Sequence, residues 1–349
     1  MGVRERLATA LHRAGALEAA MRLRRAAPIP STLSILTYHH IAEDEPNYRY
    51  DPGVADATPA QFRRQMELVA KVGTPVTIAD VVRALDGAAL PKNPVMVTFD
   101  DGYKSCVETA LPILNAVGMP AVFFVATSYI EDRLLYWWER IALILNSAKR
   151  ARAHIHYPIS LDIQAKDPAA LRMLAHIIKD TTGLDLERFL GELAAAFGVE
   201  WHRDTESEHA NKMVMTWDDI RTLAAAGMDI ESHSRRHRVL QTLDPATLDD
   251  ELSGSKRELE AQLGRECQAI AYPVGYRIAH IKPIRDAVAK AGYKVGFTNA
   301  TGATRIWPGA LGRMIPTDRY DVCRLSTDRE LSDAMFLAQI ALPRLAYVS

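Results

Sequence analysis

The chain has 349 residues, of which 48% are hydrophobic and 24% are charged, and these values are typical of a globular protein with a sizeable core. They exclude a disordered chain, a collagen-like fibre and a disulfide scaffold. The 42 basic and 43 acidic side chains give a formal net charge of −1, which argues against a nucleic-acid-binding protein because such proteins are usually basic. No apolar run reaches the length of about 18 residues that a membrane span needs. Three widely spaced cysteines, Cys106, Cys267 and Cys323, predict reduced thiols in a reducing compartment.

Residues 1–30 contain six arginines, and their apolar residues recur at helical spacing, which predicts a basic amphipathic helical arm. The arm lacks the continuous apolar segment that is typical of a secretory signal, so we expect a cytoplasmic protein. The arm has two interpretations: weak docking on the anionic inner surface of a membrane, or packing on the domain or on a second copy in a homo-oligomer. Packing is favoured because alanine dominates the apolar face and no Trp or Phe anchor is present. The two prolines of Ala26–Thr32 then predict a linker to a domain at residues 31–349.

Strand and helix patterns alternate in the rest of the chain. Apolar runs predict strands at Leu33–Tyr38, Pro94–Phe99, Ala121–Ala126, Met228–Ser232, Gln268–Tyr272 and Lys294–Thr298. Helical patterns lie at Pro59–Val72, Lys104–Val117, Trp217–Ala226, Pro245–Leu263 and Ile281–Ala291, and Thr58, Thr216 and Asp244 are expected to cap three of them. This alternation predicts an α/β fold with a parallel sheet, either open or closed into a barrel.

Residues 128–215 interrupt the alternation. They contain Trp137 and Trp138 and continue as a polar, mainly helical stretch with no strand pattern. We interpret them as an insertion on one loop that follows a strand, where barrel enzymes build the walls of their substrate sites. One of the two indole rings is then expected to pack in the core, while the other is a candidate to stack on a sugar ring.

Two polar motifs follow predicted strands. Val95–Gly102 reads V-M-V-T-F-D-D-G, so the carboxylates Asp100 and Asp101 lie at the carboxyl end of a strand, where a metal ligand and a base are commonly placed. Glu231–Leu240 reads E-S-H-S-R-R-H-R-V-L, and His233 and His237 are four positions apart, a spacing that suits a metal site on a helical turn. One carboxylate and two imidazoles leave coordination positions open, as a hydrolytic metal requires.

Two further motifs also end strands. Ala271–Gly275 reads A-Y-P-V-G and predicts a tight turn whose backbone N–H groups either face the site or form a plain loop. Leu36–Ile41 reads L-T-Y-H-H-I, and strand alternation should send His39 and His40 to opposite sides, so at most one of them reaches the site.

Together these four motifs resemble the polysaccharide deacetylases of the NodB-homology type, carbohydrate esterase family four. T-F-D-D-G is similar to the family's first motif and H-S-x-x-H to its second, and L-T-Y-H-H-I resembles the opening strand of the exopolysaccharide deacetylase branch. The resemblance covers roughly residues 33–127 and 216–316. It implies a distorted (β/α) barrel and a metal-dependent hydrolase that removes an N-acetyl group from an amino sugar, with a carbohydrate substrate and a divalent metal, most simply zinc.

The resemblance also implies roles for individual residues. Asp100 would be the catalytic base, Asp101 a metal ligand together with His233 and His237, and Val274 the donor of an N–H to an oxyanion. The turn that includes Tyr272 and Pro273 would border the substrate. With Arg277, Arg313, Trp137 and Trp138 these two residues are our candidate substrate contacts.

Two departures from the family pattern matter. The arginine that usually lies near the third motif and pairs with the base is absent there, and Arg277 and Arg313 are the candidates to replace it. The late L-x-x-H segment that supplies the general acid is also absent. In the resembled branch a histidine of the first strand does that work, which assigns the acid to His39, with His280 as the competing candidate.

Three alternatives to N-deacetylation stay open. A relative on the same fold could open a cyclic amide or remove formyl from a sugar nucleotide. An O-deacetylase would need less help from an acid. A catalytically silent carbohydrate-binding relative is disfavoured because a binding protein has no need of the base Asp100.

Overall fold

The computed structural model describes residues 2–26, 32–278, 280–306 and 317–342, so the predicted linker and Arg313 lie wholly or partly outside the described residues. The helices are α1 (Val3–Arg13), α2 (Ala16–Ala26), α3 (Pro59–Val72), α4 (Ile78–Leu85), α5 (Leu111–Val117), α6 (Thr127–Glu131), α7 (Trp137–Asn146), α8 (Ala170–Asp180), α9 (Leu186–Phe197), α10 (Arg203–Met213), α11 (Trp217–Ala225), α12 (Pro245–Asp249), α13 (Ser255–Leu263), α14 (Lys282–Lys290) and α15 (Asp333–Ala341). The strands are β1 (Thr32–Tyr38), β2 (His40–Ile41), β3 (Ala55–Ala57), β4 (Thr74–Pro75), β5 (Pro94–Phe99), β6 (Ala121–Val125), β7 (Arg152–Ile155), β8 (Leu161–Gln164), β9 (Asp229–Ser232), β10 (Ala269–Ala271), β11 (Val295–Thr301), β12 (Thr304–Arg305) and β13 (Val322–Ser326).

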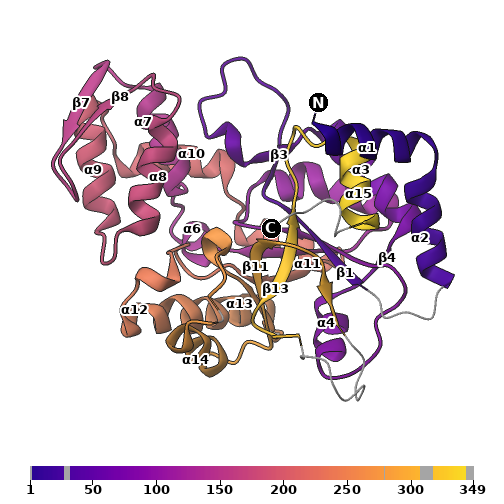
Figure 1. Ribbon diagram of the computed structural model, residues 1–349. Coiled ribbons are helices and arrows are strands. Elements are labelled where there is room, and N and C mark those ends of the chain that lie inside the picture. Colours follow the sequence, from indigo (N-terminus) through magenta and orange to yellow (C-terminus); the bar gives the residue numbers. More distant parts are fainter. Residues whose placement is uncertain (1, 27–31, 279, 307–316, 343–349) are drawn as a thin grey trace.

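In the part of the chain that the structure describes, seven strands pair in parallel in the order β1-β13-β11-β10-β9-β6-β5, and β5 pairs again with β1. This second pairing of β1 closes the sheet into a barrel with helices around it (Figure 1). The expected distorted (β/α) barrel is therefore confirmed, and all barrel strands point their carboxyl ends towards one rim.

Alternate residues of the barrel strands enter two separate apolar clusters. Val95, Val97 and Phe99 pack with the residues of α3, whereas Met96 packs in a second cluster with residues of β6, β10, β11 and α4. Because the surrounding helices contribute mainly to the first cluster, the second fills the barrel interior. Asp100 has the same strand parity as Met96 and therefore begins on the interior side.

The predicted elements of the barrel agree with the structure to within a few residues. Thr58, Thr216 and Asp244 accept hydrogen bonds from backbone N–H groups of α3, α11 and α12, so all three expected caps are confirmed. The predicted helix Pro245–Leu263 is divided by a π-helical turn at Asp250–Gly254 between α12 and α13. The strand β13 was not predicted, because an arginine stands in the middle of its short apolar run.

The segment predicted as an insertion lies between β6 and β9 and forms a separate group of elements beside the barrel, drawn at the left of Figure 1. It is mainly helical, as predicted, but β7 and β8 form an antiparallel hairpin. The expectation that this stretch contains no strand is therefore wrong. Its strands were missed because they are only four residues long and carry exposed side chains at alternate positions.

The N-terminal arm is two helices rather than one. Gly15, with φ of 66°, separates α1 from α2. Ala8, Leu17 and Met21 are buried in the main apolar cluster, and the two helices lie against α15 (Figure 1). The packing interpretation of the arm therefore holds for its inner face. Among the described residues, no helix combines the length and apolar character needed to cross a bilayer.

Candidate active site

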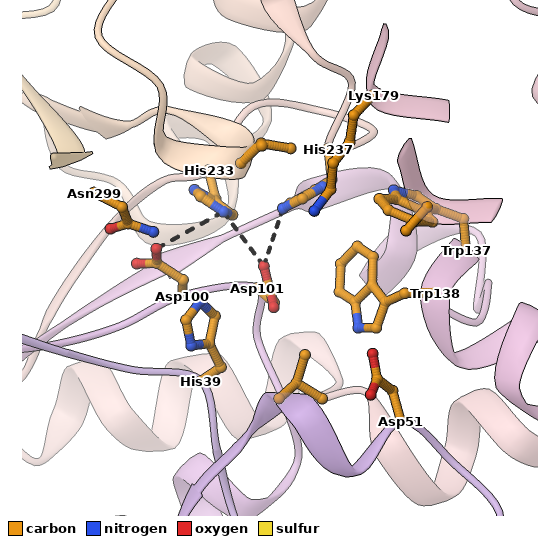
Figure 2. A pocket seen from close by; sticks show the side chains of 13 residues that line it. His39, Asp51, Asp100, Asp101, Trp137, Trp138, Lys179, His233, His237 and Asn299 are labelled. Carbon is orange, nitrogen blue, oxygen red and sulfur yellow. Dashed lines mark ion pairs between the residues drawn. The ribbon is translucent and has the colours of Figure 1, made fainter. Parts of the chain in front are cut away.

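The carboxyl ends of the barrel strands meet at one cavity, which Figure 2 shows from close by. Eight residues predicted for the site line it: His39, Asp100, Asp101, Trp137, Trp138, His233, His237 and Val274. Five more line it that the sequence did not single out: Asp51, Val54, Ala175, Lys179 and Asn299. Residues from five barrel strands and from the insertion are thereby brought together.

Three buried side chains at the floor of this cavity form a candidate metal centre. The Nε2 atoms of His233 and His237 each lie 3.3 Å from Oδ1 of Asp101, and one donor atom from each residue lies within 4.8 Å of the others. The Asp101 Oδ1 atom is buried and has no hydrogen-bond partner among the described residues. A buried carboxylate oxygen facing two imidazole nitrogens is the donor set that a divalent transition metal prefers, so these residues fit such an ion.

The protonation of the centre suits a metal as well. His233 lies with Nδ1 2.9 Å from the carbonyl oxygen of Ala271, so Nδ1 donates there and Nε2 faces Asp101. Burial alone would raise the pKa of the Asp101 carboxyl, but the two imidazoles outweigh burial and hold that pKa well below its usual range. Asp101 is therefore an anion at neutral pH.

Strained backbone presents two of these ligands. Asp101 and His237 have φ values of 74° and 51°, and Ser234 has 62°, all in the left-handed region that L-residues seldom adopt. Such strain persists only where the surroundings hold it. The metal-ligand loop after β9 is thus held in one conformation by its contacts.

Glu251 makes the contacts that hold this loop. Its buried Oε2 accepts hydrogen bonds from Ser234 Oγ at 2.8 Å and from the backbone N–H groups of Arg235 and Arg236 at 3.1 and 2.8 Å. The π-helical turn between α12 and α13 supplies Glu251. The sequence alone gave no reason to single this residue out.

Asp100 is paired with Arg324, a residue that the sequence analysis missed. Both are fully buried, and the guanidinium nitrogens lie 2.7 Å from Oδ1 and 2.7 Å from Oδ2 in a bidentate contact. Burial would raise the pKa of Asp100, but the charge of Arg324 outweighs burial and holds that pKa below its usual value. Asp100 is therefore ionised, and it is not one of the three candidate metal ligands.

The expectation that Arg277 replaces the missing arginine is wrong. Its guanidinium donates to Asp321 at 2.9 Å and to the Cys323 sulfur, its side chain is 55% exposed, and it does not line the cavity. Arg313, the other candidate, lies outside the described residues. The pairing arginine comes instead from β13, the last barrel strand, whose Val322 and Arg324 share the interior face.

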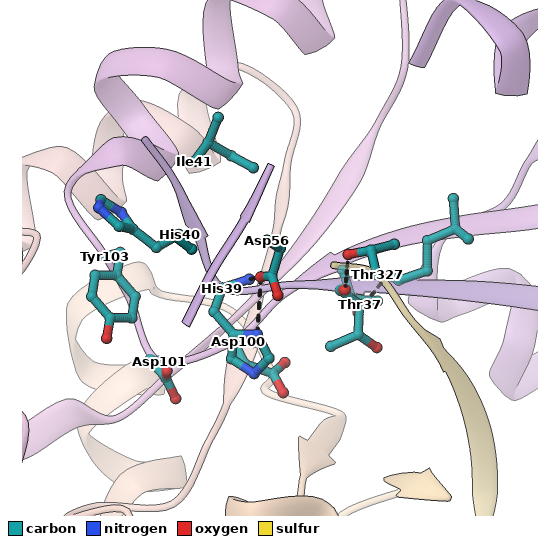
Figure 3. A network of polar contacts seen from close by, with 12 residues as sticks. Thr37, His39, His40, Ile41, Asp56, Asp100, Asp101, Tyr103 and Thr327 are labelled. Atoms are coloured by element: carbon teal, nitrogen blue, oxygen red, sulfur yellow. Dashed lines mark hydrogen bonds and ion pairs between the residues drawn. The ribbon is translucent and has the colours of Figure 1, made fainter. Parts of the chain in front are cut away.

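His39 and His40 diverge, as strand alternation predicted (Figure 3). His39 lines the cavity and its Nδ1 lies 3.1 Å from Oδ2 of Asp56, which also accepts the His39 backbone N–H. Burial would lower the pKa of His39, but the charge and hydrogen bond of Asp56, helped by the carboxylates of the D-D motif, raise it to about 10. His39 is thus a protonated side chain that faces the cavity.

His40 turns away into the protein. Its Nδ1 lies 2.8 Å from Ser105 Oγ, and its ring stacks on Tyr103 with centroids 4.9 Å apart. Burial, with a smaller effect from Arg329, lowers the pKa of His40 to about 4. The competing acid candidate, His280, is exposed and does not line the cavity.

The turn after β10 brings Val274 to the cavity in a left-handed conformation with φ of 64°. Gly275 is required beside it, because its φ is 75° and a Cβ there would lie 2.3 Å from Cβ of Asn299. Tyr272 is buried, and its hydroxyl donates to the carbonyl oxygen of Tyr320 at 2.9 Å. The expectation that Tyr272 contacts substrate is therefore wrong, because the ring faces the core; Pro273 is likewise buried and outside the cavity lining.

Trp137 and Trp138 form one wall of the cavity from the first turn of α7. Both are nearly buried, and the Trp138 ring lies 4.7 Å from the His237 ring, measured between centroids. Trp138 Nε1 donates to Tyr103 Oη at 2.6 Å, and Tyr103 Oη donates to Glu139 Oε1 at 2.7 Å. The wall is therefore held by a buried polar chain as well as by ring packing.

Glu139 joins this wall to the loop between β2 and β3, which forms another part of the cavity lining. Its Oε2 accepts the backbone N–H of Asp51 at 2.6 Å, and Asp51 belongs to the loop between β2 and β3. Burial raises the pKa of Glu139 to about 8. The insertion is thus tied to the barrel by a carboxyl group in the protein interior.

Comparison with known proteins gives a family match. The family model for polysaccharide deacetylase matches residues 87–171 and 192–296, leaving 172–191 of the insertion between the two ranges. YxkH of Bacillus subtilis (strain 168) is 32% identical over 94 residues, which are 27% of this chain and 32% of that protein. The poly-beta-1,6-N-acetyl-D-glucosamine N-deacetylase of Escherichia coli (strain K12) is 30% identical over 98 residues, 28% of this chain and 14% of that protein.

Solved structures share the fold. The Streptococcus pyogenes deacetylase PplD, determined in complex with acetate, has a TM-score of 0.57 at 20% identity, covering 90% of this chain and 100% of that one. IcaB from Ammonifex degensii has a TM-score of 0.54 at 18% identity, covering 89% of this chain and 97% of that one.

Proposed function

The chain belongs to the polysaccharide deacetylase family, and from this premise we propose that it is a metal-dependent hydrolase that removes an N-acetyl group from an amino sugar in a glycan or glycan precursor. One observation carries the proposal. The ionised, arginine-paired Asp100 lines the same cavity as the three candidate metal ligands and a protonated histidine. A base, a metal centre and an acid are the three groups that hydrolysis of an unactivated amide needs.

Asp101, His233 and His237 would hold the ion, and zinc fits two imidazoles and one carboxylate. When bound, the ion would lower the pKa of a water molecule towards neutrality and polarise the acetamido carbonyl. Glu251 and the Ala271 carbonyl keep the two imidazoles in place before substrate arrives.

Asp100 accepts the proton of the attacking water. Its ion pair with Arg324 keeps it charged and fixes both oxygens, so that no rotation is needed before the transfer. The Val274 N–H, in a turn held by Gly275, donates to the oxyanion that develops on the carbonyl oxygen.

His39 donates a proton to the leaving nitrogen. An amine anion is a very poor leaving group, so this transfer must accompany cleavage of the C–N bond. Asp56 accepts from Nδ1 of His39 and keeps the ring oriented and charged. The products are acetate and the free amino sugar.

The test is acetate release from N-acetylated chitooligosaccharides by the metal-loaded protein. We expect release that depends on metal and is lost in Asp100→Asn, with the metal content of that variant unchanged. Release of acetate from O-acetyl esters alone, with none from amides, would favour the O-deacetylase alternative.

We also propose that the enzyme acts in the cytoplasm. The support is the chemistry of the three cysteines, none of which forms a disulfide in the described part of the chain. Recovery of the intact protein outside the cytoplasm by cell fractionation would contradict this.

A further inference from the structure

One lysine of the insertion lines the same cavity as the metal centre. Lys179 lies in the last turn of α8, and Ala175, one turn earlier, lines the cavity with it. Figure 2 shows the Lys179 side chain beside this cavity together with the residues of the barrel rim. Among the described residues that line the cavity, Lys179 is the single lysine or arginine.

The ammonium group of Lys179 has no hydrogen bond or ion pair among the described residues. Two other cations of the insertion are matched: Arg140 pairs with Glu187 at 2.8 Å, and Arg150 donates to backbone carbonyls of α9. Lys179 is only partly exposed, and burial lowers its pKa although Asp51 and Asp180 act in the opposite direction. A partly desolvated cation without a partner is unfavourable, so the site is suited to a negative charge that arrives from outside.

The other charges of the cavity leave that role to Lys179. Arg324 already neutralises Asp100, and the charge of Asp101 is committed to the two imidazoles and the ion that they fit. Asp51 also lines the cavity, but it forms no ion pair with Lys179 and carries a negative charge itself. Two positively charged side chains line the cavity, and the protonated His39 is already paired with Asp56 at 3.1 Å. An anionic group in this cavity therefore finds Lys179 as the cation that no described carboxylate pairs, and that side chain comes from the insertion.

We propose that Lys179 binds a carboxylate or phosphate group of the substrate and that the enzyme consequently acts on an acidic glycan or glycan precursor. This inference rests on the proposed function, because it places the anionic group beside the N-acetyl group that is removed. A competing explanation is purely structural, since a lysine in the last turn of a helix interacts favourably with the helix dipole. That explanation predicts an effect on stability and none on the choice of substrate.

The test compares the metal-loaded full chain with Lys179→Met and with Lys166→Met, an exposed lysine of the same insertion that does not line the cavity. Three disaccharides serve as binding probes: cellobiose, the disaccharide of glucuronic acid and glucose, and cellobiose 1-phosphate. They carry no acetyl group and so persist during a titration. The same three sugars with a 2-acetamido group serve as substrates for acetate release.

We expect Lys179→Met to weaken binding of one or both anionic probes about tenfold to a hundredfold, the usual range for a hydrogen bond to a charged group, and to leave cellobiose within twofold. The kcat/KM values for acetate release should change in the same ratio, and Lys166→Met should change neither. A loss confined to the carboxylate probe identifies a uronic acid, and a loss confined to the phosphate probe identifies a phosphorylated precursor.

Equal losses for all three probes, no loss for any, or failure of the wild type to bind either anionic probe would overturn the assignment of Lys179. Failure of the wild type to release acetate from any substrate would overturn the proposed function instead. Even without acetate release, the ratio of wild-type to Lys179→Met affinity for each probe still distinguishes anion binding by Lys179 from a purely structural role.

Discussion

The barrel rim and the insertion contribute to one cavity in different ways. At the rim Asp100, His39 and His233 are each held by a contact of 2.7 to 3.1 Å, such as the 2.7 Å contacts of Arg324 with Asp100. The insertion supplies indole rings and the unpaired Lys179, which lies in the segment between the two ranges matched by the family model. From this difference we propose that the rim performs the chemistry and that the insertion selects the substrate.

Removal of the metal should have the largest effect of any change at the rim. Asp101, His233 and His237 cannot activate water without an ion, so chelation should lower acetate release by about three orders of magnitude or more. Added divalent metal should restore it, and a series of metals identifies the one that works. Full activity in metal-stripped protein would contradict the assignment of these ligands.

Loss of the acid should come next. His39→Ala should lower kcat on an acetamido sugar by roughly two to four orders of magnitude while metal content stays the same. An acetyl ester with a good leaving group needs no proton, so it should hide this defect. His40→Ala is the control: it removes a buried contact with Ser105, so it should cost stability more than turnover. Near-normal amide hydrolysis by His39→Ala would show that another group acts as the general acid.

Arg324→Met should have an intermediate effect. Without its guanidinium the pKa of Asp100 rises, so the acidic limb of the rate profile should move to higher pH, and kcat near neutrality should fall by roughly one to two orders of magnitude. Arg277→Met is the matched control, because Arg277 pairs with Asp321 outside the cavity. A larger loss in Arg277→Met than in Arg324→Met would contradict the pairing that the structure shows.

The positions of the strand-end motifs could be predicted because apolar runs and the residues after them are local features of the sequence. Asp100, Asp101, His233, His237 and His39 each follow such a run, and parallel strands bring their ends to one rim. Arg324 was missed because its contact spans 224 positions and its strand contains a charge, which lowered the strand signal. An arginine two positions after Val322, inside a short and mainly apolar run, was the available clue.

The walls of the cavity were harder to predict for a different reason. Asp51, Asn299 and Lys179 are ordinary polar residues of a loop, a strand end and a helix, and nothing near them in sequence marks a site. Tyr272 was predicted to contact the substrate because it belongs to the turn motif. Its hydroxyl instead donates a hydrogen bond to the backbone carbonyl of Tyr320. Tertiary packing decided each of these cases.

Substitutions in the insertion should have smaller effects, and these should appear in KM rather than in kcat. Trp137→Leu keeps an apolar filler but removes the ring, and loss of one aromatic contact of about 0.5–1.5 kcal/mol should raise KM roughly twofold to tenfold with kcat unchanged. Trp201→Leu is the control, because Trp201 belongs to the insertion and does not line the cavity. If Trp137→Leu lowers only the melting temperature and leaves KM unchanged, the insertion at this point is scaffold.

The smallest expected effect is on the pH dependence of stability, and it concerns Glu139, which connects the insertion to the barrel. Its pKa is raised to about 8 by burial, well above the value of about 4.5 for an exposed glutamate. Between these values the folded protein holds a proton that the unfolded chain has released, so Glu139 makes stability fall as pH rises through that window. The penalty is complete above the folded pKa and absent below about pH 4.5.

Glu139→Gln removes this titration but keeps one carbonyl acceptor for Tyr103 or Asp51. The wild type should therefore lose stability relative to the variant, on the order of 1 kcal/mol or more, when unfolding is measured at pH 8 rather than pH 5.5. Glu200→Gln, an exposed acid of the same insertion, should show the same difference from wild type at both pH values. If the difference in unfolding free energy between the wild type and Glu139→Gln is instead the same at pH 5.5 and at pH 8, the carboxyl is ionised throughout this window, and the insertion is anchored by a charge rather than by a neutral acid.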